Sequence, residues 1–462
     1  MIDDLKPFPD YKDSGLPWLG KIPIGWEVRR NGRLFSQRNE TGYPELPILE
    51  VSLRTGVRVR DFDSSKRKQV IAEKEKYKRA CRGDIAYNMM RMWQGAVGVA
   101  PVDGLISPAY IVARPMPETQ ARYFTQLFCT DAYKNVVNIF SRGIVSDRNR
   151  LYWEDFKQIP SPFPPLDEQA AIVRYLDHAN GKIERAIRAK RKLIVLLNEQ
   201  KQVIIHRAVT RGLDPAVKLK PSGIPWLKDS PTHWHWVPIK RLLSRIDYGT
   251  SEASREDGQI RILTMGNIQR GEVILPKSGG LDEVPKSLLL EHNDILFTRT
   301  NGNPDLVGKV GLFRGHLLDN VSFASYLVRL RAKSSHDPRW LHCVLHSSTF
   351  WSFARSHALV NLQTNLNSTR YSQFHIPVPP LHEQQQIVGF IEVETYAMNT
   401  AVARTEREIK LLREYRTTLT ADVVTGKVDV REAAKRLPSE VEELPSADDL
   451  PDEIEEDTES EV

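Results

Sequence analysis

The chain of 462 residues contains 65 Lys and Arg against 59 Asp and Glu, and 40% of its residues are hydrophobic. This length and composition are those of a globular protein with two or more domains, and no apolar run approaches the ~20 residues that span a bilayer. The first residues lack a signal-peptide pattern, and Cys81, Cys129 and Cys343 are too few and too far apart for a disulfide framework or a cysteine zinc site. We therefore expect a cytoplasmic protein.

The net charge of +6 conceals a strong asymmetry along the chain. Residues 438–462 contain twelve acidic side chains and no Lys or Arg, whereas residues 1–437 contain 65 basic and 47 acidic side chains, a balance of +18. A body this basic predicts a polyanionic partner, and residues 433–462 are expected to form a disordered acidic tail.

The first half of the chain begins with SGLPWLGKIPIGW at residues 14–26. The runs at 48–53, 84–89 and 109–114 alternate or are rich in β-branched residues, which predicts strands, and a helix is expected over 121–139. PPLDEQAAIV at 164–173 then opens a long segment with apolar residues at three- and four-residue steps. Two prolines and the acidic pair Asp167-Glu168 are typical of a helix start.

The second half repeats this order. SGIPWLKDSPTHW at 222–234 matches the first motif at a constant offset of 208, a helix is expected over 338–354, and PPLHEQQQIV at 379–388 matches 164–173 at an offset of 215. Weaker matches between them, such as Gly83-Asp84-Ile85 with Asn293-Asp294-Ile295, occur in the same order. The chain is therefore two copies of one unit, each a globular domain followed by a long helix.

The two long helices carry matching apolar positions. Examples are Ile183, Ile187, Ile194 and Ile204 in the first helix, matched by Met398, Val402, Ile409 and Leu419 in the second. This spacing predicts a coiled coil, interrupted by polar residues at equivalent steps. A duplicated chain most easily buries matching faces about a pseudo-twofold axis, so antiparallel helices with the domains at opposite ends are expected. The alternative is that each helix packs only on its own domain.

The sequence contains no complete motif for catalysis. GNPDLVGK at 302–309 has one residue too many between its glycines for a phosphate-binding loop, so a turn is expected there. His342 and His346 have helical spacing but lack the HExxH glutamate, and His233 and His235 are expected to flank a packed aromatic residue. No nucleophile motif, glycine-rich cofactor loop or metal site is apparent, and an endonuclease would need a carboxylate-metal site that the sequence does not show.

Polar loops occupy corresponding places in the two halves. Arg91 and Arg299 each follow the matched Asp-Ile strand, and polar side chains gather at 142–150 and 361–370. Arg suits guanine edges, while Asn and Gln suit adenine edges. The candidates for DNA contact are Arg54, Arg91, Arg142, Arg148, Arg150, Arg299, Asn301, Asn361, Gln363, Asn365, Asn367 and Arg370. The alternative for any one of these residues, taken alone, is that it is an ordinary solvated loop residue.

The paired SGxPWL and PPLxEQ motifs around two dissimilar domains resemble the DNA-specificity (S) subunit of type I restriction-modification enzymes, over residues 11–430. The resemblance implies an α+β fold with two β-rich target recognition domains joined by two long antiparallel coiled-coil helices and a pseudo-twofold internal duplication. The implied segments are the first recognition domain at 1–163, a central helix at 164–212, the second domain at 213–378, a C-terminal helix at 379–432 and the tail at 433–462.

The resemblance also implies a function: a non-catalytic subunit that recognises a split double-stranded DNA target for DNA methylation and phage defence. It implies docking of adenine-methyltransferase subunits, expected to be two, and of a motor-nuclease subunit, with no membrane partner. S-adenosylmethionine, ATP and Mg would bind those partners, and no cofactor or metal is expected in this chain. Glu168, Gln169, Glu383 and Gln384 would lie at the helix starts, facing a docking partner or the adjacent domain. The alternative is a stand-alone DNA-binding protein, either a repressor or an architectural clamp.

Overall fold

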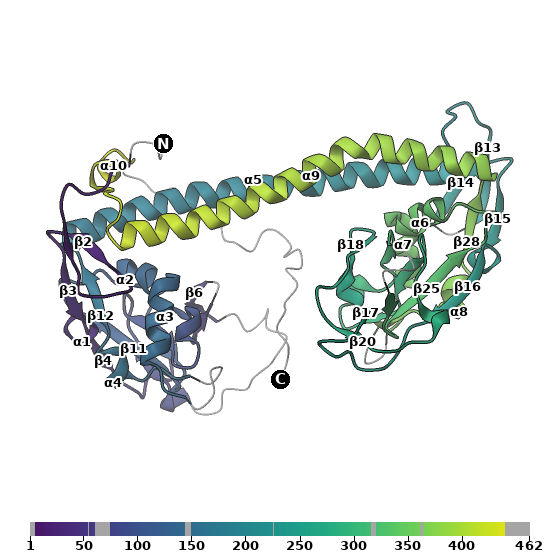
Figure 1. Ribbon diagram of the computed structural model, residues 1–462. Helices are drawn as coiled ribbons and strands as arrows, with labels where there is room; N and C mark the ends of the chain where they lie inside the picture. Colours follow the sequence, from purple (N-terminus) through teal and green to yellow (C-terminus); the bar gives the residue numbers. More distant parts are fainter. Residues whose placement is uncertain are drawn as a thin grey trace. The chain divides into compact units, whose positions relative to one another are not determined.

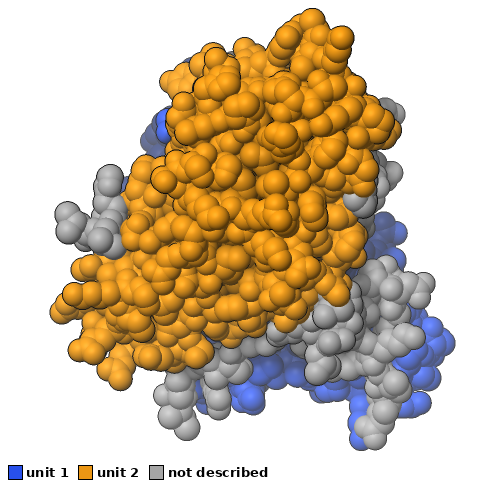
Figure 2. Space-filling view, turned by 90° about the vertical axis from the view of Figure 1, so that its right-hand side faces the viewer, with its two compact units in different colours: residues 1–189, 407–447 blue, residues 190–406, 448–462 orange. Residues whose placement is uncertain are grey.

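The computed structural model describes residues 5–53, 55–60, 74–143, 149–224, 226–315, 320–360 and 364–438. The chain packs as two compact units, coloured separately in Figure 2. The first comprises residues 1–189 and 407–447, and the second comprises residues 190–406 and 448–462. Each unit thus contains one globular domain and half of each long helix, so the units cut across the linear segments expected from the sequence.

The first domain is built on a four-stranded antiparallel sheet in the order β4-β11-β8-β9, accompanied by the pairs β1-β2, β5-β6, β10-β7 and β12-β3. The strands expected at 48–53, 84–89 and 109–114 are present as β5, β8 and β11. The strands are β1 (Tyr11–Asp13), β2 (Lys21–Pro23), β3 (Glu27–Arg30), β4 (Phe35–Arg38), β5 (Leu49–Ser52), β6 (Gly56–Val59), β7 (Lys78–Ala80), β8 (Ile85–Asn88), β9 (Val97–Val99), β10 (Gly104–Ile106), β11 (Tyr110–Pro115) and β12 (Pro160–Phe163).

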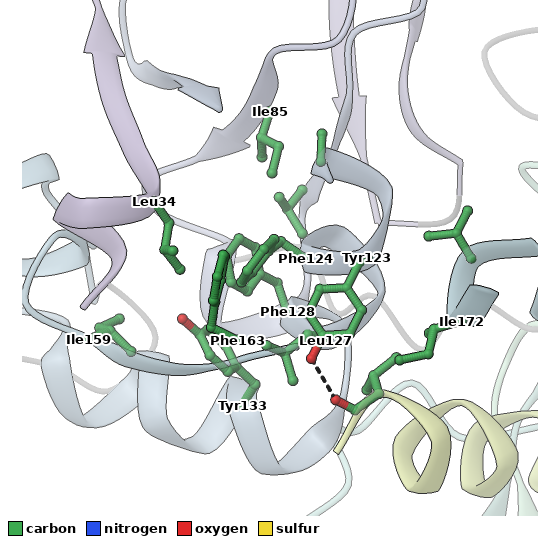
Figure 3. Packing of buried hydrophobic residues seen from close by; sticks show 14 of the residues in the cluster. Leu34, Ile85, Tyr123, Phe124, Leu127, Phe128, Tyr133, Ile159, Phe163 and Ile172 are labelled. Carbon is green, nitrogen blue, oxygen red and sulfur yellow. Dashed lines mark hydrogen bonds between the residues drawn. The ribbon is translucent and has the colours of Figure 1, made fainter. Parts of the chain in front are cut away.

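Helices cover the main core of this domain. Aromatic side chains dominate the core, and Tyr123, Phe124 and Phe128 from one helix are fully buried (Figure 3). Burying such rings is a large part of the stability of any core. The helices are α1 (Asn31–Leu34), α2 (Ala121–Phe128), α3 (Asp131–Phe140) and α4 (Trp153–Phe156), with the 3-10 turns η1 (Lys74–Lys76) and η2 (Met92–Gln94).

The second domain contains a six-stranded sheet in the order β16-β25-β21-β23-β19-β18, the three-stranded sheets β20-β17-β24 and β22-β27-β26, and the pairs β13-β14 and β15-β28. The strands are β13 (Leu219–Ile224), β14 (Leu227–Pro231), β15 (His235–Pro238), β16 (Leu243–Tyr248), β17 (Ile260–Leu263), β18 (Ile268–Gln269), β19 (Glu272–Val273), β20 (Gly280–Leu281), β21 (Ile295–Thr298), β22 (Thr300–Asn301), β23 (Val310–Leu312), β24 (Val321–Phe323), β25 (Leu327–Ala332), β26 (Leu359–Val360), β27 (Thr364–Asn365) and β28 (His375–Val378).

The helices of the second domain are α6 (Pro338–His346), α7 (Ser348–Ser356) and α8 (Ser368–Ser372), with the 3-10 turns η4 (Ile239–Arg241), η5 (Met265–Asn267), η6 (Lys286–Leu288) and η7 (Pro304–Leu306). The topology repeats that of the first domain, because β16-β25-β21-β23 corresponds to β4-β11-β8-β9 and β15-β28 corresponds to β3-β12. In the two sheets Tyr87 pairs with Ile111 and Phe297 with Val328, so the register is also equivalent. The predicted duplication is present in the fold.

Each helix expected inside a domain is interrupted by a hydroxyl residue. The prediction over 121–139 becomes α2 and α3, because Thr130 is extended and its hydroxyl accepts the Tyr133 N–H as an N-cap. The prediction over 338–354 becomes α6 and α7, because Ser347 is extended and its hydroxyl donates to the Val344 carbonyl. Local hydrogen bonds of this kind compete with a continuous helix.

The two long helices are α5 (Leu166–Arg211) and α9 (Leu381–Val424). Within the first unit, the start of α5 packs with the end of α9, where Ile172 and Val423 share one core. Within the second unit, the end of α5 packs with the start of α9, where Val209 and Val388 share another. The helices therefore run antiparallel within each unit (Figure 1). After α9 the chain adds only α10 (Arg431–Lys435) to the described residues.

The expected apolar positions form the seam between the helices, with one shift. Ile183 and Ile187 are buried in the first unit, and Ile194 and Val402 in the second. Ile205 rather than the expected Ile204 is buried at the end of α5. Arg416, which interrupts the pattern, forms an ion pair with Glu184 at 3.3 Å.

The duplicated motifs join each domain to both helices. Trp26 is fully buried, and its indole Nε1 donates to Glu168 at the start of α5 over 2.8 Å. Gly426, beyond the end of α9, has a φ of 77° and lies so close to Trp26 that a Cβ would be 3.0 Å from the ring. Tyr123 also donates to the Val424 carbonyl at the end of α9 (2.9 Å), as Figure 3 shows.

The second unit repeats the arrangement with Trp234, whose indole donates to both oxygens of Glu383 at 3.1 Å. Gly212 after α5, with a φ of 73°, is the counterpart of Gly426. Each domain is therefore fastened to the start of one long helix and the end of the other.

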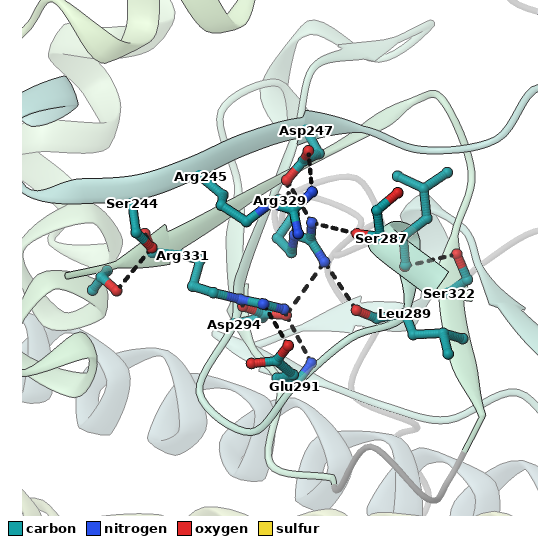
Figure 4. A network of polar contacts seen from close by, with 12 residues as sticks. Ser244, Arg245, Asp247, Ser287, Leu289, Glu291, Asp294, Ser322, Arg329 and Arg331 are labelled. Atoms are coloured by element: carbon teal, nitrogen blue, oxygen red, sulfur yellow. Dashed lines mark hydrogen bonds and ion pairs between the residues drawn. The ribbon is translucent and has the colours of Figure 1, made fainter. Parts of the chain in front are cut away.

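A buried ion network stabilises the sheet of the second domain (Figure 4). Arg329 on β25 is fully buried and bonds Asp247 at 2.5 Å and the carbonyls of Ser287 and Leu289. Asp294 is 1% exposed and accepts from Arg331 and from the Glu291 N–H. Asp84, its counterpart in the first domain, accepts from Arg38 and the Cys81 N–H. The matched aspartate thus accepts the N–H three residues before it in both domains, while its arginine partner comes from β4 in the first domain and from β25 in the second.

Candidate nucleic-acid interface

Candidate residues of the second domain converge on the sheet β22-β27-β26. Asn301 on β22 pairs with Thr364 on β27, and Thr300 pairs with Asn365. Just before β22, the Arg299 carbonyl accepts the Leu366 N–H at 2.8 Å. The loop after β21 and the segment before α8, far apart in sequence, therefore form one surface, which we call the second loop cluster (residues 299–301 and 365–370).

Arg299 is the central side chain of the second loop cluster. Its guanidinium is 5.1 Å from the centre of the Tyr248 ring, and the Tyr248 hydroxyl bonds Ser368 at 2.6 Å. Within the described part of the chain, the buried Nε of Arg299 and the buried Oδ1 of Asn365 have no hydrogen-bond partner. Both atoms are buried, so in this arrangement they are not open to a ligand, whereas the Tyr248 ring is 41% exposed and offers an aromatic face beside the Arg299 guanidinium.

Other candidates in this cluster help to hold the loops. Asn367 caps α8 by accepting the Arg370 N–H at 2.8 Å, and Arg370 donates to the His357 carbonyl at 2.7 Å. The Asn301 Oδ1 accepts the Asn303 N–H at 2.8 Å. These side chains therefore have an architectural role whether or not they contact a ligand.

The first domain brings the corresponding segments together. The Met89 carbonyl accepts the Leu151 N–H at 2.9 Å, which is the counterpart of the bond between Arg299 and Leu366. The backbones of Arg142 and Arg150 form an isolated antiparallel β-bridge. We call this surface the first loop cluster (residues 89–94, 142 and 149–152).

The equivalence assigns a counterpart to each arginine. Arg91 and Arg299 both follow the matched Asp-Ile strand, but the hydrogen bonds show that Met89 is equivalent to Arg299 and that Arg91 is equivalent to Asn301. Arg91 is exposed, and its Nε donates to Gln94 at 2.8 Å. Arg142 is 72% exposed and forms an ion pair with Asp155 at 2.5 Å. The two clusters thus present different side chains on the same framework.

Four candidates, Arg54, Arg148, Asn361 and Gln363, lie outside the described residues. Three exposed aromatic residues were not predicted from the sequence: Tyr152 in the first loop cluster, and Tyr248 and Tyr326 beside the second. Tyr152 is two residues from Arg150, and the Tyr326 carbonyl accepts the Arg299 N–H at 2.9 Å. The only sequence signal for them was their closeness to polar or matched segments.

The four residues at the helix starts have partners in the adjacent domain. Glu168, which accepts from the Trp26 indole, also pairs with Arg431 at 3.3 Å. Glu383, which accepts from the Trp234 indole, also bonds His233 at 2.9 Å. Gln169 is fully buried, accepts the Gln120 N–H and donates to the Pro164 and Glu118 carbonyls. Gln384 makes the equivalent bonds to Asp337 and Pro379. These four residues were expected to face either a docking partner or the adjacent domain, and in the structure they contact the adjacent domain.

The segments tested for catalysis are structural in the described residues. Residues 302–309 form a turn containing η7 between β22 and β23, as expected. His342 and His346 stack at 5.4 Å on α6, where burial lowers the pKa of His342 to about 3 and that of His346 to about 4. No cluster of three or more metal-binding side chains occurs in the described ranges. None of the helices described there is long and apolar enough to cross a membrane.

Residues 26–191 and 248–410 match the family described as "Type I restriction modification DNA specificity domain". The StySPI specificity subunit of Salmonella potsdam is 23% identical over 349 residues, covering 71% of this chain and 73% of that protein. The EcoKI specificity subunit of Escherichia coli (strain K12) is 23% identical over 357 residues, covering 71% and 74%.

A solved structure titled "Structural basis underlying complex assembly and conformational transition of the type I R-M system" has a TM-score of 0.59 at 15% identity. It covers 87% of this chain and 98% of its own, and shows that the fold is shared. With two family domains in one chain, two equivalent loop clusters and this fold, the protein belongs to the type I restriction-modification specificity subunits, the non-catalytic components that recognise DNA sequence.

Proposed function

We propose that each domain recognises one half of a split double-stranded DNA target through its own loop cluster. The observation that carries this proposal is the pair of equivalent hydrogen bonds, Leu151 to Met89 and Leu366 to Arg299, which set different side chains on one framework. Two domains of common descent with different contact residues are what an asymmetric, two-part sequence requires. Arg299 and Arg91 are the main candidates for base contact, and the remaining basic side chains neutralise phosphates.

The long helices, in this proposal, dock the methyltransferase subunits. Leu196 on α5 is 51% exposed, and its equivalent on α9, Leu411, is 55% exposed. Leu166 and Leu381 at the two helix starts are a second equivalent pair, 50% and 39% exposed. Exposed apolar side chains at duplicated positions favour two copies of one partner, since each unit offers the same contact. We propose two methyltransferase subunits, with one motor-nuclease subunit joining the complex.

The chemistry then belongs to the partners. S-adenosylmethionine would be held by the methyltransferase subunits, which modify adenine, and ATP and Mg by the motor-nuclease subunit. This chain contributes binding, orientation and the distance between the two half-sites. About 45 helical residues at ~1.5 Å each correspond to a length of roughly 65–70 Å, enough to separate two contact sites on one duplex.

An exchange of one domain tests the two-domain proposal. Residues 219–376 are replaced by the corresponding domain of a relative, and the methylated motif of the host genome is mapped before and after. One half of a split motif should change while the other half and the methylation itself persist. A change in both halves, or in neither, contradicts the proposal. Copurification with a methyltransferase subunit separates it from a stand-alone DNA-binding protein.

A further inference from the structure

Tyr248 lies at the point where the main sheet of the second domain meets the second loop cluster. It is the last residue of β16 and pairs with Val328 on β25. The next residue, Gly249, packs so closely on the neighbouring backbone that a Cβ there would overlap the Phe323 carbonyl oxygen. Because no side chain fits at that position, the chain holds Tyr248 at one place beside the cluster.

The hydroxyl of Tyr248 fixes its ring to the opposite segment of the cluster. It lies 2.6 Å from the Ser368 hydroxyl and accepts the Ser368 N–H at 3.3 Å. Ser368 is the first residue of α8, where backbone N–H groups have no partner within the helix. The side chain of Tyr248 is therefore held at both ends, by the strand at its base and by α8 at its tip.

The backbone of Arg299 is fixed on both sides, but its side chain is held in another way. The Arg299 N–H donates to the Tyr326 carbonyl at 2.9 Å, and the Arg299 carbonyl accepts the Leu366 N–H at 2.8 Å. Among the described residues the guanidinium forms no ion pair with a carboxylate, and it lies 5.1 Å from the centre of the Tyr248 ring. The ring therefore orients the guanidinium through a cation–π contact.

A guanidinium that rests on an aromatic ring is suited to reading a guanine. The N–H donors of its two terminal nitrogens match the O6 and N7 acceptors of guanine, provided that their plane coincides with the plane of the base. An unrestrained arginine side chain loses rotamer entropy when it adopts that orientation, whereas contact with the ring restricts it beforehand. Tyr248 thus supplies the orientation, and Arg299 supplies the hydrogen bonds.

The first domain has a different side chain at the place of Tyr248. Val328, the strand partner of Tyr248, is equivalent to Ile111. Ile111 lies opposite Asn39 when the register of β11 with β4 is continued by one residue. An asparagine offers no aromatic face to an arginine, so the effect of Tyr248 should be confined to one half-site.

We propose that Tyr248 is a positioning residue, which holds the Arg299 guanidinium for reading a guanine in the half-site of the second domain. This inference rests on the proposed function of the second loop cluster and names the base that the cluster recognises. It assigns base preference to a residue that acts through Arg299 and not through its own hydrogen bond to DNA.

Duplexes with a modified guanine test the contact. The probe is a duplex that carries the split motif methylated in the host, and the protein is the full chain with its methyltransferase subunits. Each guanine in the half-site of the second domain, on either strand, is replaced in turn by 7-deazaguanine, which lacks the N7 acceptor but still pairs with cytosine. One replacement should weaken binding by the parent about five-fold or more, and R299A should lose that sensitivity.

Variants of Tyr248 separate positioning from a general structural role. Y248L keeps a bulky apolar side chain without an aromatic face, so its sensitivity to 7-deazaguanine should fall to that of R299A. Y248F and S368A keep the ring and lose the bond between the two hydroxyls, so each should retain an intermediate sensitivity. The matched control Y43L removes a ring that lies 4.8 Å from the Arg79 guanidinium in the first domain, and it should keep the sensitivity of the parent.

The outcomes distinguish this inference from the proposed function. If R299A loses the sensitivity while Y248L keeps it, Tyr248 does not position Arg299, and the proposed function stands. If Y248L does not assemble, parent sensitivity in both Y248F and S368A overturns the inference. If no guanine of the half-site responds in the parent, Arg299 does not read a guanine and the inference is also overturned. The proposed function fails separately, when exchange of the second domain leaves the methylated motif unchanged.

Discussion

The indole nitrogen of Trp234 lies 3.1 Å from each carboxylate oxygen of Glu383, which is 149 residues away in the chain. Trp26 and Glu168 repeat this relationship in the first unit at 2.8 Å. The tryptophan comes from the SGxPWL motif region and the glutamate from PPLxEQ, so the two duplicated motifs are the two sides of one contact. Their recurrence reflects the need to fasten each domain to a helix start.

Removing the Glu383 carboxylate should destabilise the second unit. In Glu383→Ala the buried Trp234 N–H loses its charged acceptor, at a cost of about 1.5–3 kcal/mol in the free energy of unfolding. Glu383→Gln retains an acceptor oxygen and should cost less. Urea denaturation followed by tryptophan fluorescence measures both, with the exposed Glu394→Ala on α9 as the control, expected within about 0.5 kcal/mol of the parent. Equal losses for Glu383→Ala and Glu394→Ala would contradict the structural role.

Breaking the buried ion network should have a larger effect. Asp294→Ala leaves Arg329, which is fully buried, and Arg331 without this carboxylate, and a loss of about 3–5 kcal/mol is expected. The matched control is Asp282→Ala, which breaks an exposed pair with Arg255 at 3.6 Å and should cost under about 1 kcal/mol. Denaturation midpoints of the two variants are compared. A loss for Asp294→Ala as small as that for Asp282→Ala would show that the network adds little.

The stacked histidines predict a loss of stability in acid. Burial lowers the pKa of His342 to about 3 and of His346 to about 4, from an ordinary value of 6.5. Between pH 6.5 and 4 the unfolded chain therefore binds protons that the folded chain does not, so the free energy of unfolding falls as the pH falls. His342→Leu should lose less stability than the parent between pH 7 and pH 5.

The midpoint of urea denaturation at the two pH values measures this difference. His235→Leu, which removes an exposed histidine, is the control and should keep the pH dependence of the parent. Because carboxylate titration is common to all three proteins, it cancels in the comparison. Identical pH dependence in His342→Leu and the parent would exclude the pair as the source.

Substitutions in the two loop clusters should separate the two half-sites. Arg299→Ala is expected to weaken binding by about 1–3 kcal/mol and to relax base preference in one half of the target only. Arg91→Ala should do the same for the other half. Binding to duplexes altered in one half-site, measured at fixed salt concentration, gives both the loss of affinity and the change in base preference. Lys410→Ala on α9 should change neither preference, and a uniform loss across sequences would identify Arg299 as a phosphate contact.

Much of the architecture was predictable because its signals are local. The spacing of Ile183, Ile187 and Ile194 indicated a helix with one apolar side, and the constant offsets of 208 and 215 indicated a duplicated chain. Each of the two helices predicted inside the domains is divided into two shorter helices in the structure. The divisions lie at Thr130 and Ser347, where a side-chain hydrogen bond competes with a continuous helix. The spacing of apolar residues in the sequence does not reveal this competition between a side-chain hydrogen bond and the helix.

The sequence by itself determined the duplication, the two long helices, the basic body with its acidic end, and the lack of a recognisable catalytic motif. Only the tertiary structure decided which residues meet. It places Arg299 beside Leu366 and Tyr248, and it makes Met89, not Arg91, the counterpart of Arg299. It also packs each domain against the start of one long helix and the end of the other. Helical periodicity is encoded by neighbours within a few residues. Contacts across 60 to 400 residues depend on the path of the whole chain, which packing of the buried cores selects.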